Sequence, residues 1–209
     1  MSTKYIENTD KALVGIDRFH YAPLVEDTET TLEYGAMSHL PNTVNISVAM
    51  NASTETLYAD NKAAIIYSSI GNVELTAERT TIPEDVLAEW LGSAMDGGVR
   101  YVSQEQNSPY MGVAWRQVYS DGSYSYVKLY KGKFTEPDKS AVTKGETVEF
   151  QTATIVANFA STNYVKKVTG VGVSKEFPLL MSVASEDAKG YTDEGDTWFD
   201  AMVPAPVGG

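Results

Sequence analysis

Alternation of apolar and polar positions dominates the chain after its first 40 residues. Apolar side chains occupy every second position of residues 44–50 and again of residues 73–77. A strand places successive side chains on opposite faces, so this period predicts strands with one buried face. Residues 147–159 alternate in the same way and predict another long strand. The chain is therefore predicted to be mainly β.

The clearest β-hairpin prediction lies between Gly112 and Tyr130. The segment "MGVAWRQVYS" is followed by Asp121-Gly122 and then by "SYSYVKLYKGKF". An Asp-Gly pair accommodates the positive φ angles that a tight turn requires. We predict two antiparallel strands joined at this dipeptide.

One predicted helix interrupts the strands at about 82–91. In "TIPEDVLAEWLGS" Pro83 stands near the first helical position, two acidic residues follow at the positive end of the helix dipole, and Gly92 provides the stop. The apolar residues of this segment fall on one stripe: Val86, Leu87, Trp90 and Leu91. We expect this stripe to pack against a sheet. A second, shorter helix is predicted near 192–202.

Residues 51–64 break the alternating pattern. The segment "NASTETLYADNKAA" is mostly small and polar, which predicts an exposed loop. Leu57 and Tyr58 stand out in it, because apolar side chains on a flexible loop have no core to enter. One interpretation is an ordinary loop with a locally packed tyrosine, and the other is a contact with a second protein.

Composition and charge narrow the class of protein. The 209 residues suffice for one sizeable core, and 43% hydrophobic residues are typical of a folded chain. Sixteen basic against twenty-eight acidic residues give a net charge of -12, which opposes binding to a phosphate backbone. The chain has no cysteine, no signal-peptide core and no membrane-length apolar run, so we expect a cytosolic protein without membrane contact.

Few residues suggest catalysis, a metal or a cofactor. His20 and His39 stand in no metal-ligand spacing and beside no nucleophile motif, so structural roles are expected. No glycine-rich phosphate or dinucleotide motif is present, and "YTDEGDTW" lacks the ligand spacing of a calcium loop. A glycosidase pair is conceivable among four glutamates on predicted strands, although solvated faces explain them more simply: Glu74, Glu78, Glu146 and Glu149.

A row of tyrosines offers a different kind of site. Tyr124, Tyr126 and Tyr130, with Lys128 between them, are predicted to share one strand face. Such a row serves as a platform for a sugar or a base, or as an amphipathic layer between two protein surfaces. We favour the layer, and a carbohydrate-binding β-sandwich module remains the alternative function.

Seven segments, taken in order, carry a family resemblance: "GIDRFHYAPL", "SVAMNASTETLYADN", "LTAERTTIPEDVLAEWLG", "DGGVRYV", "SPYMGVAWRQVYSDGSYSYVKLYKGKFTEP", "TKGETVEFQTATIVANF" and "WFDAMVP". Together they resemble the major tail proteins of long-tailed, non-contractile bacteriophages and prophages of Gram-positive hosts. The most specific parts are "ETLYADN" and the run from "YVKLYKGKFTEP" to "KGETVEFQT". The extreme N-terminus and residues 164–191 depart from the family pattern.

The resemblance implies a fold and an assembly. The fold is mainly β: an antiparallel β-sandwich or partly closed barrel of the tail-tube type with one flanking helix. Residues 1–160 would form the β domain with an N-terminal arm, and residues 161–209 would complete or decorate it. The subunit would be a structural virion protein without enzymatic activity, assembled in the host cytoplasm. Six-membered rings would stack into the tail tube through which the genome is ejected.

The resemblance also implies partners and contact residues. The chain would bind copies of itself, the tape-measure protein, the tail terminator and the distal tail protein, while DNA would pass through the lumen without specific binding. Loop 51–64 would contact the neighbouring ring through four residues: Thr56, Leu57, Tyr58 and Asp60. The candidates for acids that face the lumen are Glu74, Glu78, Glu146 and Glu149.

Overall fold

The computed structural model describes residues 11–59, 62–105, 107–139, 151–170, 173–188 and 190–203. The elements in chain order are β1 (Leu13–Asp27), β2 (Leu32–Tyr34), β3 (Ser38–His39), β4 (Thr43–Ala59), β5 (Lys62–Arg79), α1 (Glu84–Leu91), β6 (Ala94–Asp96), β7 (Val99–Tyr101), β8 (Met111–Tyr119), β9 (Tyr124–Phe134), β10 (Ala153–Ala160), β11 (Val165–Gly170), β12 (Val173–Pro178), β13 (Met181–Ser185) and α2 (Glu194–Thr197).

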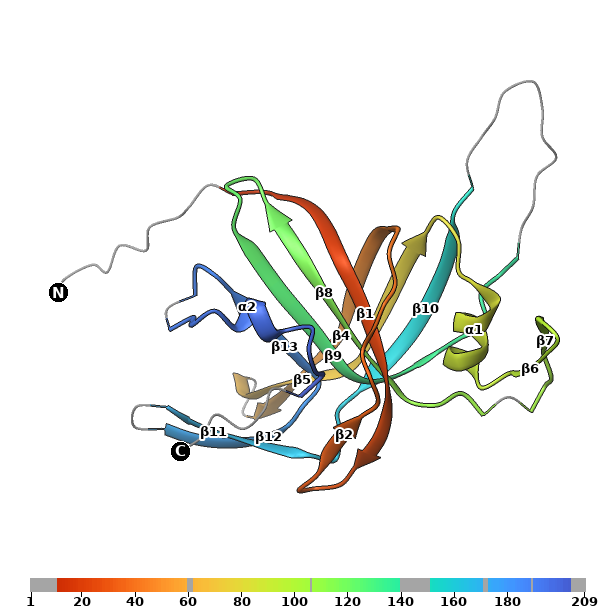
Figure 1. Ribbon diagram of the computed structural model, residues 1–209. Coiled ribbons are helices and arrows are strands. Elements are labelled where there is room, and N and C mark those ends of the chain that lie inside the picture. The colour runs from red at the N-terminus through yellow and green to blue at the C-terminus, as the bar shows by residue number, and fades with distance from the viewer. Residues whose placement is uncertain are drawn as a thin grey trace.

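One large antiparallel sheet organises these strands. Its order is β2-β1-β8-β9-β10-β5-β4, with β3 beside β1 and β13 beside β9. The sheet is strongly twisted, and β4 and β2 stand at opposite ends of the order, so the described strands form no closed barrel (Figure 1). Two separate hairpins, β6–β7 and β11–β12, flank it. The predicted mainly β, antiparallel fold with a flanking helix is confirmed.

The predicted hairpin and helix both form where the sequence places their turns and stops. Gly122 has φ 85° in the β8–β9 turn, and its N–H donates to the Tyr119 carbonyl at 3.0 Å. Helix α1 begins directly after Pro83 and ends at Gly92, which takes the left-handed conformation at φ 67°. A glycine tolerates this conformation without the steric penalty that a side chain would add.

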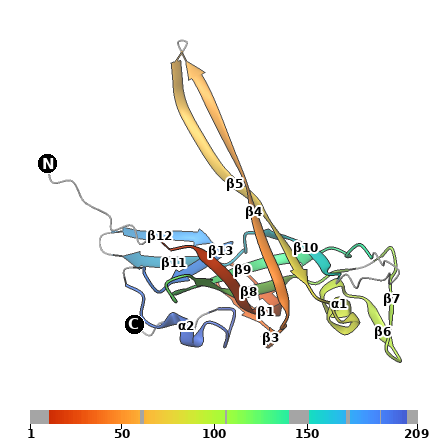
Figure 2. The same cartoon turned by 90° about the horizontal axis from the view of Figure 1, so that it is seen from above.

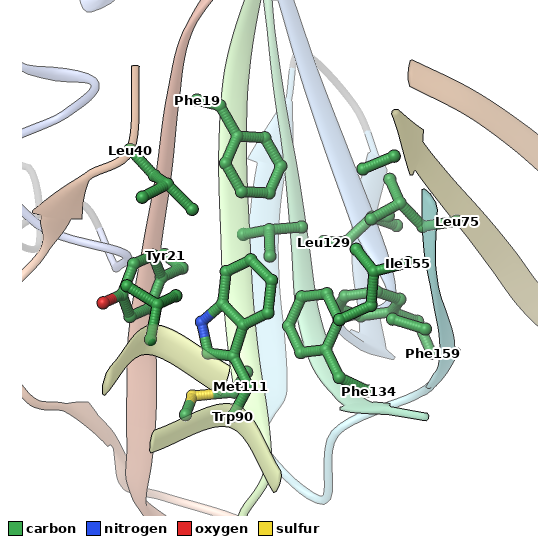
Figure 3. Close-up of a cluster of buried hydrophobic side chains, with 14 of the residues drawn as sticks. Phe19, Tyr21, Leu40, Leu75, Trp90, Met111, Leu129, Phe134, Ile155 and Phe159 are labelled. Carbon is green, nitrogen blue, oxygen red and sulfur yellow. The ribbon is translucent and has the colours of Figure 1, made fainter. Parts of the chain in front are cut away.

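The main core lies between α1 and one face of the sheet. Trp90 of α1 stacks on Phe134 of β9 with ring centroids 4.1 Å apart, and it meets Tyr21 of β1 edge-on at 5.2 Å. Figure 3 shows Trp90 among side chains from β1, β5, β8, β9 and β10. The apolar stripe predicted for the helix is therefore buried against the sheet, as expected.

The opposite face of the sheet is covered only in part. Over β8 and β9 it carries a second core in which Trp198 and Met202 pack on Tyr126 and Tyr130. Figure 1 places α2 and β13 on this side, away from β10. Over β10, β5 and β4 the same face is polar and bare, with Glu74 among its exposed residues.

Burial of the tyrosines corrects a prediction. Tyr126 and Tyr130 are 5% and 3% exposed, because the segment containing Trp198 lies over them. Lys128, between them, is also buried and donates a hydrogen bond from Nζ to the Ala201 carbonyl at 2.7 Å. The row is neither a platform for a sugar nor a layer that meets another protein, and the carbohydrate-binding alternative loses its basis.

The predicted helix near 192–202 is shorter than expected. Only the single turn α2 forms, and Trp198 follows it into the second core. Neither described helix has the length or the apolar character needed to traverse a bilayer.

Candidate interaction surface

The β4–β5 hairpin divides into two halves with different surroundings. In the half next to the sheet, Val48 pairs with Leu75 and Ile46 with Ala77, and these side chains face the main core. At the end of this half, the buried guanidinium of Arg79 donates hydrogen bonds to the carbonyl oxygens of Leu40 and Pro41. We call this the proximal half, residues 43–50 and 71–79.

A bulge separates the two halves. The register of β4 against β5 shifts between Met50 and Ala52, where Gly71 and Asn72 of β5 stand opposite the single residue Asn51 of β4. A Cβ added to Gly71 would lie 3.1 Å from the Asn51 carbonyl oxygen, so the two backbones approach closely. Bulges bend and twist the strand that carries them. Beyond this point the hairpin projects away from the rest of the molecule (Figure 2).

The projecting half, which we call the distal arm, comprises residues 51–59 and 62–70. It corrects the prediction of a loop at 51–64, because these residues pair in an antiparallel ladder up to Ala59 and Lys62. Small polar residues such as Ser53 and Thr54 are compatible with this ladder, since backbone pairing needs no apolar side chain. The loop-like composition reflects the absence of a core beneath the arm. Asp60 lies outside the described residues.

Large apolar side chains occur on both faces of the distal arm. Directly paired residues share a face, so Leu57 and Ile65 lie on one face and Ile66, paired with Thr56, lies on the other. The large apolar residues and their exposed fractions are Leu57 62%, Tyr58 69%, Ile65 59%, Ile66 68%, Tyr67 67% and Ile70 59%. Neither face of the arm has a partner within the described chain.

This arrangement suits the arm for protein association. Apolar surface that a monomer leaves exposed in one place marks an interaction site or an aggregation hazard. β5 pairs with β10 only from Val73 onward, so the outer edges of the distal arm also keep free backbone donors and acceptors. Both apolar contact and strand addition are therefore available to a partner.

The predicted acidic residues fall on the bare polar face. Glu74 and Glu78 point to the same side of β5, and Glu78 accepts a hydrogen bond from Thr152 Oγ1 at 2.5 Å. Four residues of strand separate their Cα atoms by about 13 Å, wider than the roughly 5–9.5 Å between glycosidase carboxyl groups. This spacing does not support a glycosidase pair at these two residues. Glu146 and Glu149 lie outside the described residues.

An apolar groove lies next to the second core. It has a volume of about 500 Å³ and is formed by β13, the β11–β12 hairpin and the chain around α2. Phe177, Leu179 and Val183 line it, and Lys166 contributes a charged side chain. Most of the lining belongs to residues 164–191, the segment that departs from the family pattern.

Sequence reasoning missed the groove and part of the arm. The run Ile65-Ile66-Tyr67 could have signalled the arm, because three consecutive apolar residues on a strand put apolar side chains on both faces. No comparable signal marks the groove. It forms where β13 pairs with β9, far away in the sequence.

The titratable groups of the described residues suggest no reaction centre. His20 stacks on His39 with ring centroids 4.6 Å apart, and burial lowers its pKa. Burial also lowers the pKa of Lys128, to about 8. Within the described ranges no group of three or more histidine, cysteine, aspartate or glutamate residues is placed to hold a metal ion.

Comparisons with known proteins include a weak structural likeness. A scan against protein-family models and a search of curated proteins each found no match. Among solved structures, a chain of the anti-feeding prophage (AFP) baseplate, a 6-fold symmetrised cryo-EM structure, is similar with a TM-score of 0.33 and 9% identity. The match covers 90% of this chain and 100% of that chain. A TM-score of this size does not establish a common fold.

Proposed function

We propose that the protein is a structural subunit of a phage tail tube, in which six-membered rings stack to form the conduit for the genome. The observation that carries this proposal is the distal arm, whose large apolar side chains are exposed on both faces. The family resemblance of the ordered sequence segments supports it independently. The subunit would function through association with its own copies.

The distal arm provides the kind of contact that a tube requires. A head-to-tail contact between unlike surfaces closes into a ring or continues as an open stack, depending on the rotation between copies. Full burial of one large aliphatic side chain contributes about 1.5–3 kcal/mol. Leu57, Tyr58 and Thr56 would contribute to the seam between rings, together with Ile65 and Ile66 from the partner strand.

The bare polar face supplies a surface for the lumen. Glu74 and Glu78 lie on it, with Asn45 opposite Glu78 on β4 and Asn158 opposite Glu74 on β10. If this face lines the channel, its charge repels a DNA duplex, and screening limits the repulsion to about 8 Å at physiological salt. DNA would slide past without specific binding. The tape-measure protein, tail terminator and distal tail protein would be further partners.

Electron microscopy of the purified protein and of one arm variant tests the proposal. Wild-type protein should form rings or tubes, whereas Leu57→Asp with Tyr58→Asp should give folded subunits that do not grow. The matched control is Val25→Asp, which alters a residue of β1 that is 68% exposed and lies away from the arm. Wild-type protein that stays monomeric at high concentration would contradict the tube, and normal tubes from the arm variant would contradict the role of the arm.

A further inference from the structure

The apolar groove carries a cation, Lys166, for which the described residues provide no ion-pair partner. Lys166 and Phe177 are paired across β11 and β12, so their side chains share the face that lines the groove. The adjacent Lys167 forms an ion pair with Glu176 at 3.0 Å, but no described acidic residue pairs with Lys166. Glu194, also in the lining, is engaged by the N–H and hydroxyl of Thr192. The groove therefore combines an apolar lining with one unpaired positive charge.

One face of the distal arm has the complementary composition. Glu55 pairs across the hairpin with Tyr67, and Leu57 pairs with Ile65, so these four side chains share a face. Glu55 is the only charged residue among residues 51–58 and 65–70, and no described basic residue pairs with it. This face carries three large apolar residues and one negative charge that no described cation pairs with.

We propose that this arm face docks in the apolar groove of another copy of the chain, with Glu55 beside Lys166. The inference rests on the proposed self-assembly and identifies the surface that receives the arm. About nine residues of strand extend roughly 30 Å beyond the bulge. Figure 2 shows the arm pointing away from the body that carries the groove, so the occupant comes from a second copy.

The chemistry of the two surfaces favours this pairing over a contact with the bare polar face. Apolar anchors in a desolvated groove supply most of the energy of an interface, while a matched charge pair sets its register. The bare polar face carries Glu74 and Glu78, which have the same charge as Glu55, and its described residues are mainly small or polar. Because arm and groove are different surfaces, each docked pair keeps one free arm and one free groove, and the assembly can continue.

A charge exchange tests the pairing. Glu55→Lys and Lys166→Glu should each weaken assembly about tenfold or more in sedimentation velocity, since each places like charges in contact. The chain with both substitutions should recover at least half of wild-type assembly. Lys167→Glu is the matched control, because it breaks only an exposed ion pair, and it should assemble like wild type. Normal assembly of Lys166→Glu, or no recovery in the double variant, would overturn the pairing.

Mixing two defective subunits tests the geometry of the contact. Leu57→Asp removes the arm face, and Val183→Asp blocks the groove at a residue of β13 that is exposed in the subunit. Neither variant should polymerise alone, and circular dichroism should show both folded. Their equimolar mixture should give complexes larger than either variant forms alone, because the intact arm of one meets the intact groove of the other.

The outcomes separate this inference from the proposed function. If wild-type protein forms tubes and Val183→Asp does so equally well, the arm docks elsewhere and the inference fails while the tube subunit stands. If wild-type protein forms no tubes under any condition, the proposed function fails first. Binding of the arm by the chain's own groove would appear as compact wild-type monomers that Val183→Asp expands, and it would overturn the inference.

Discussion

The proximal half and the distal arm of the β4–β5 hairpin share one antiparallel ladder but differ in the burial of their side chains. In the proximal half Val73 and Leu75 are fully buried and Glu74 between them is exposed. In the distal arm Ile65 and Ile66 lie on opposite faces and both are exposed. Backbone pairing thus forms a strand in both halves, and only in the proximal half does a core bury one face. Apolar side chains that are exposed on both faces mark an interaction site or an aggregation hazard.

The largest expected effect is a difference in stability between alanine variants of two leucines in this hairpin. Leu75→Ala should lower the free energy of unfolding by about 2–5 kcal/mol, because it leaves a cavity in a packed core. Leu57→Ala should change it by no more than about 0.5 kcal/mol, because its side chain is already exposed. Urea unfolding of the unassembled subunits measures both.

For tube formation the two substitutions should rank in the reverse order, with the larger effect at Leu57. Leu57→Ala should weaken tube formation, while Leu75→Ala should leave the association of folded subunits near that of wild type. A large loss of stability from Leu57→Ala would mean that the arm packs on its own body, and the comparison would break.

An effect of intermediate size is expected on the pH dependence of stability. It comes from Lys128, which is buried in the sheet and lies outside the distal arm. Burial lowers the pKa of its ammonium from 10.5 to about 8 in the folded state. Below pH 8 both states hold the proton, so the full penalty for burying the charge is present. Between pH 8 and 10 the folded state releases the proton while the unfolded state keeps it, so stability rises by up to about 1.4 kcal/mol per pH unit.

Tyrosines set the upper limit of this window. Burial raises the pKa of Tyr21 and Tyr126 to about 12, so above about pH 10 the unfolded state loses protons that the folded state retains, and stability falls. Lys128→Met should abolish the rise between pH 8 and 10 in urea unfolding. If stability still rises between pH 8 and 10 in this variant, a group other than Lys128 causes the rise.

The smallest effect is expected at the bulge between the two halves. Gly71→Ala adds a Cβ 3.1 Å from the Asn51 carbonyl oxygen, which requires a small backbone shift. Alanine also suits a strand interior better than glycine by about 0.5–1 kcal/mol, so the two effects oppose one another. The free energy of unfolding, measured by thermal denaturation, should change by no more than about 0.5 kcal/mol. Tube formation should fall, because the arm changes direction. Unchanged tube formation would show that the angle of the arm is not fixed at this residue.

Local chemistry made some elements predictable from the sequence. The Asp121-Gly122 turn needs a positive φ, and Gly122 has one; α1 begins after Pro83 and ends at Gly92. These features depend on neighbours in the chain. The burial of Leu75 was also predicted, because apolar residues alternate with polar residues on either side of it along the strand.

Long-range contacts account for what the sequence did not reveal. The tyrosine row looked amphipathic, but Trp198, more than 60 residues away, decides that Tyr126 is buried. Residues 51–59 looked like a loop because strand formation there depends on pairing with β5 and not on a core. The groove needs β13 beside β9, which no local pattern indicates.

Hydrogen exchange of the subunit before and after assembly tests the central claim most directly. Backbone amides of the proximal half, such as those of Val73 and Leu75, should be protected in both states. Outward-facing amides of the distal arm should exchange quickly in the subunit and become strongly protected in the assembled particle, because neighbouring copies cover both faces. Arm amides that exchange equally fast in both states would contradict the claim that the arm is buried by other copies of the chain.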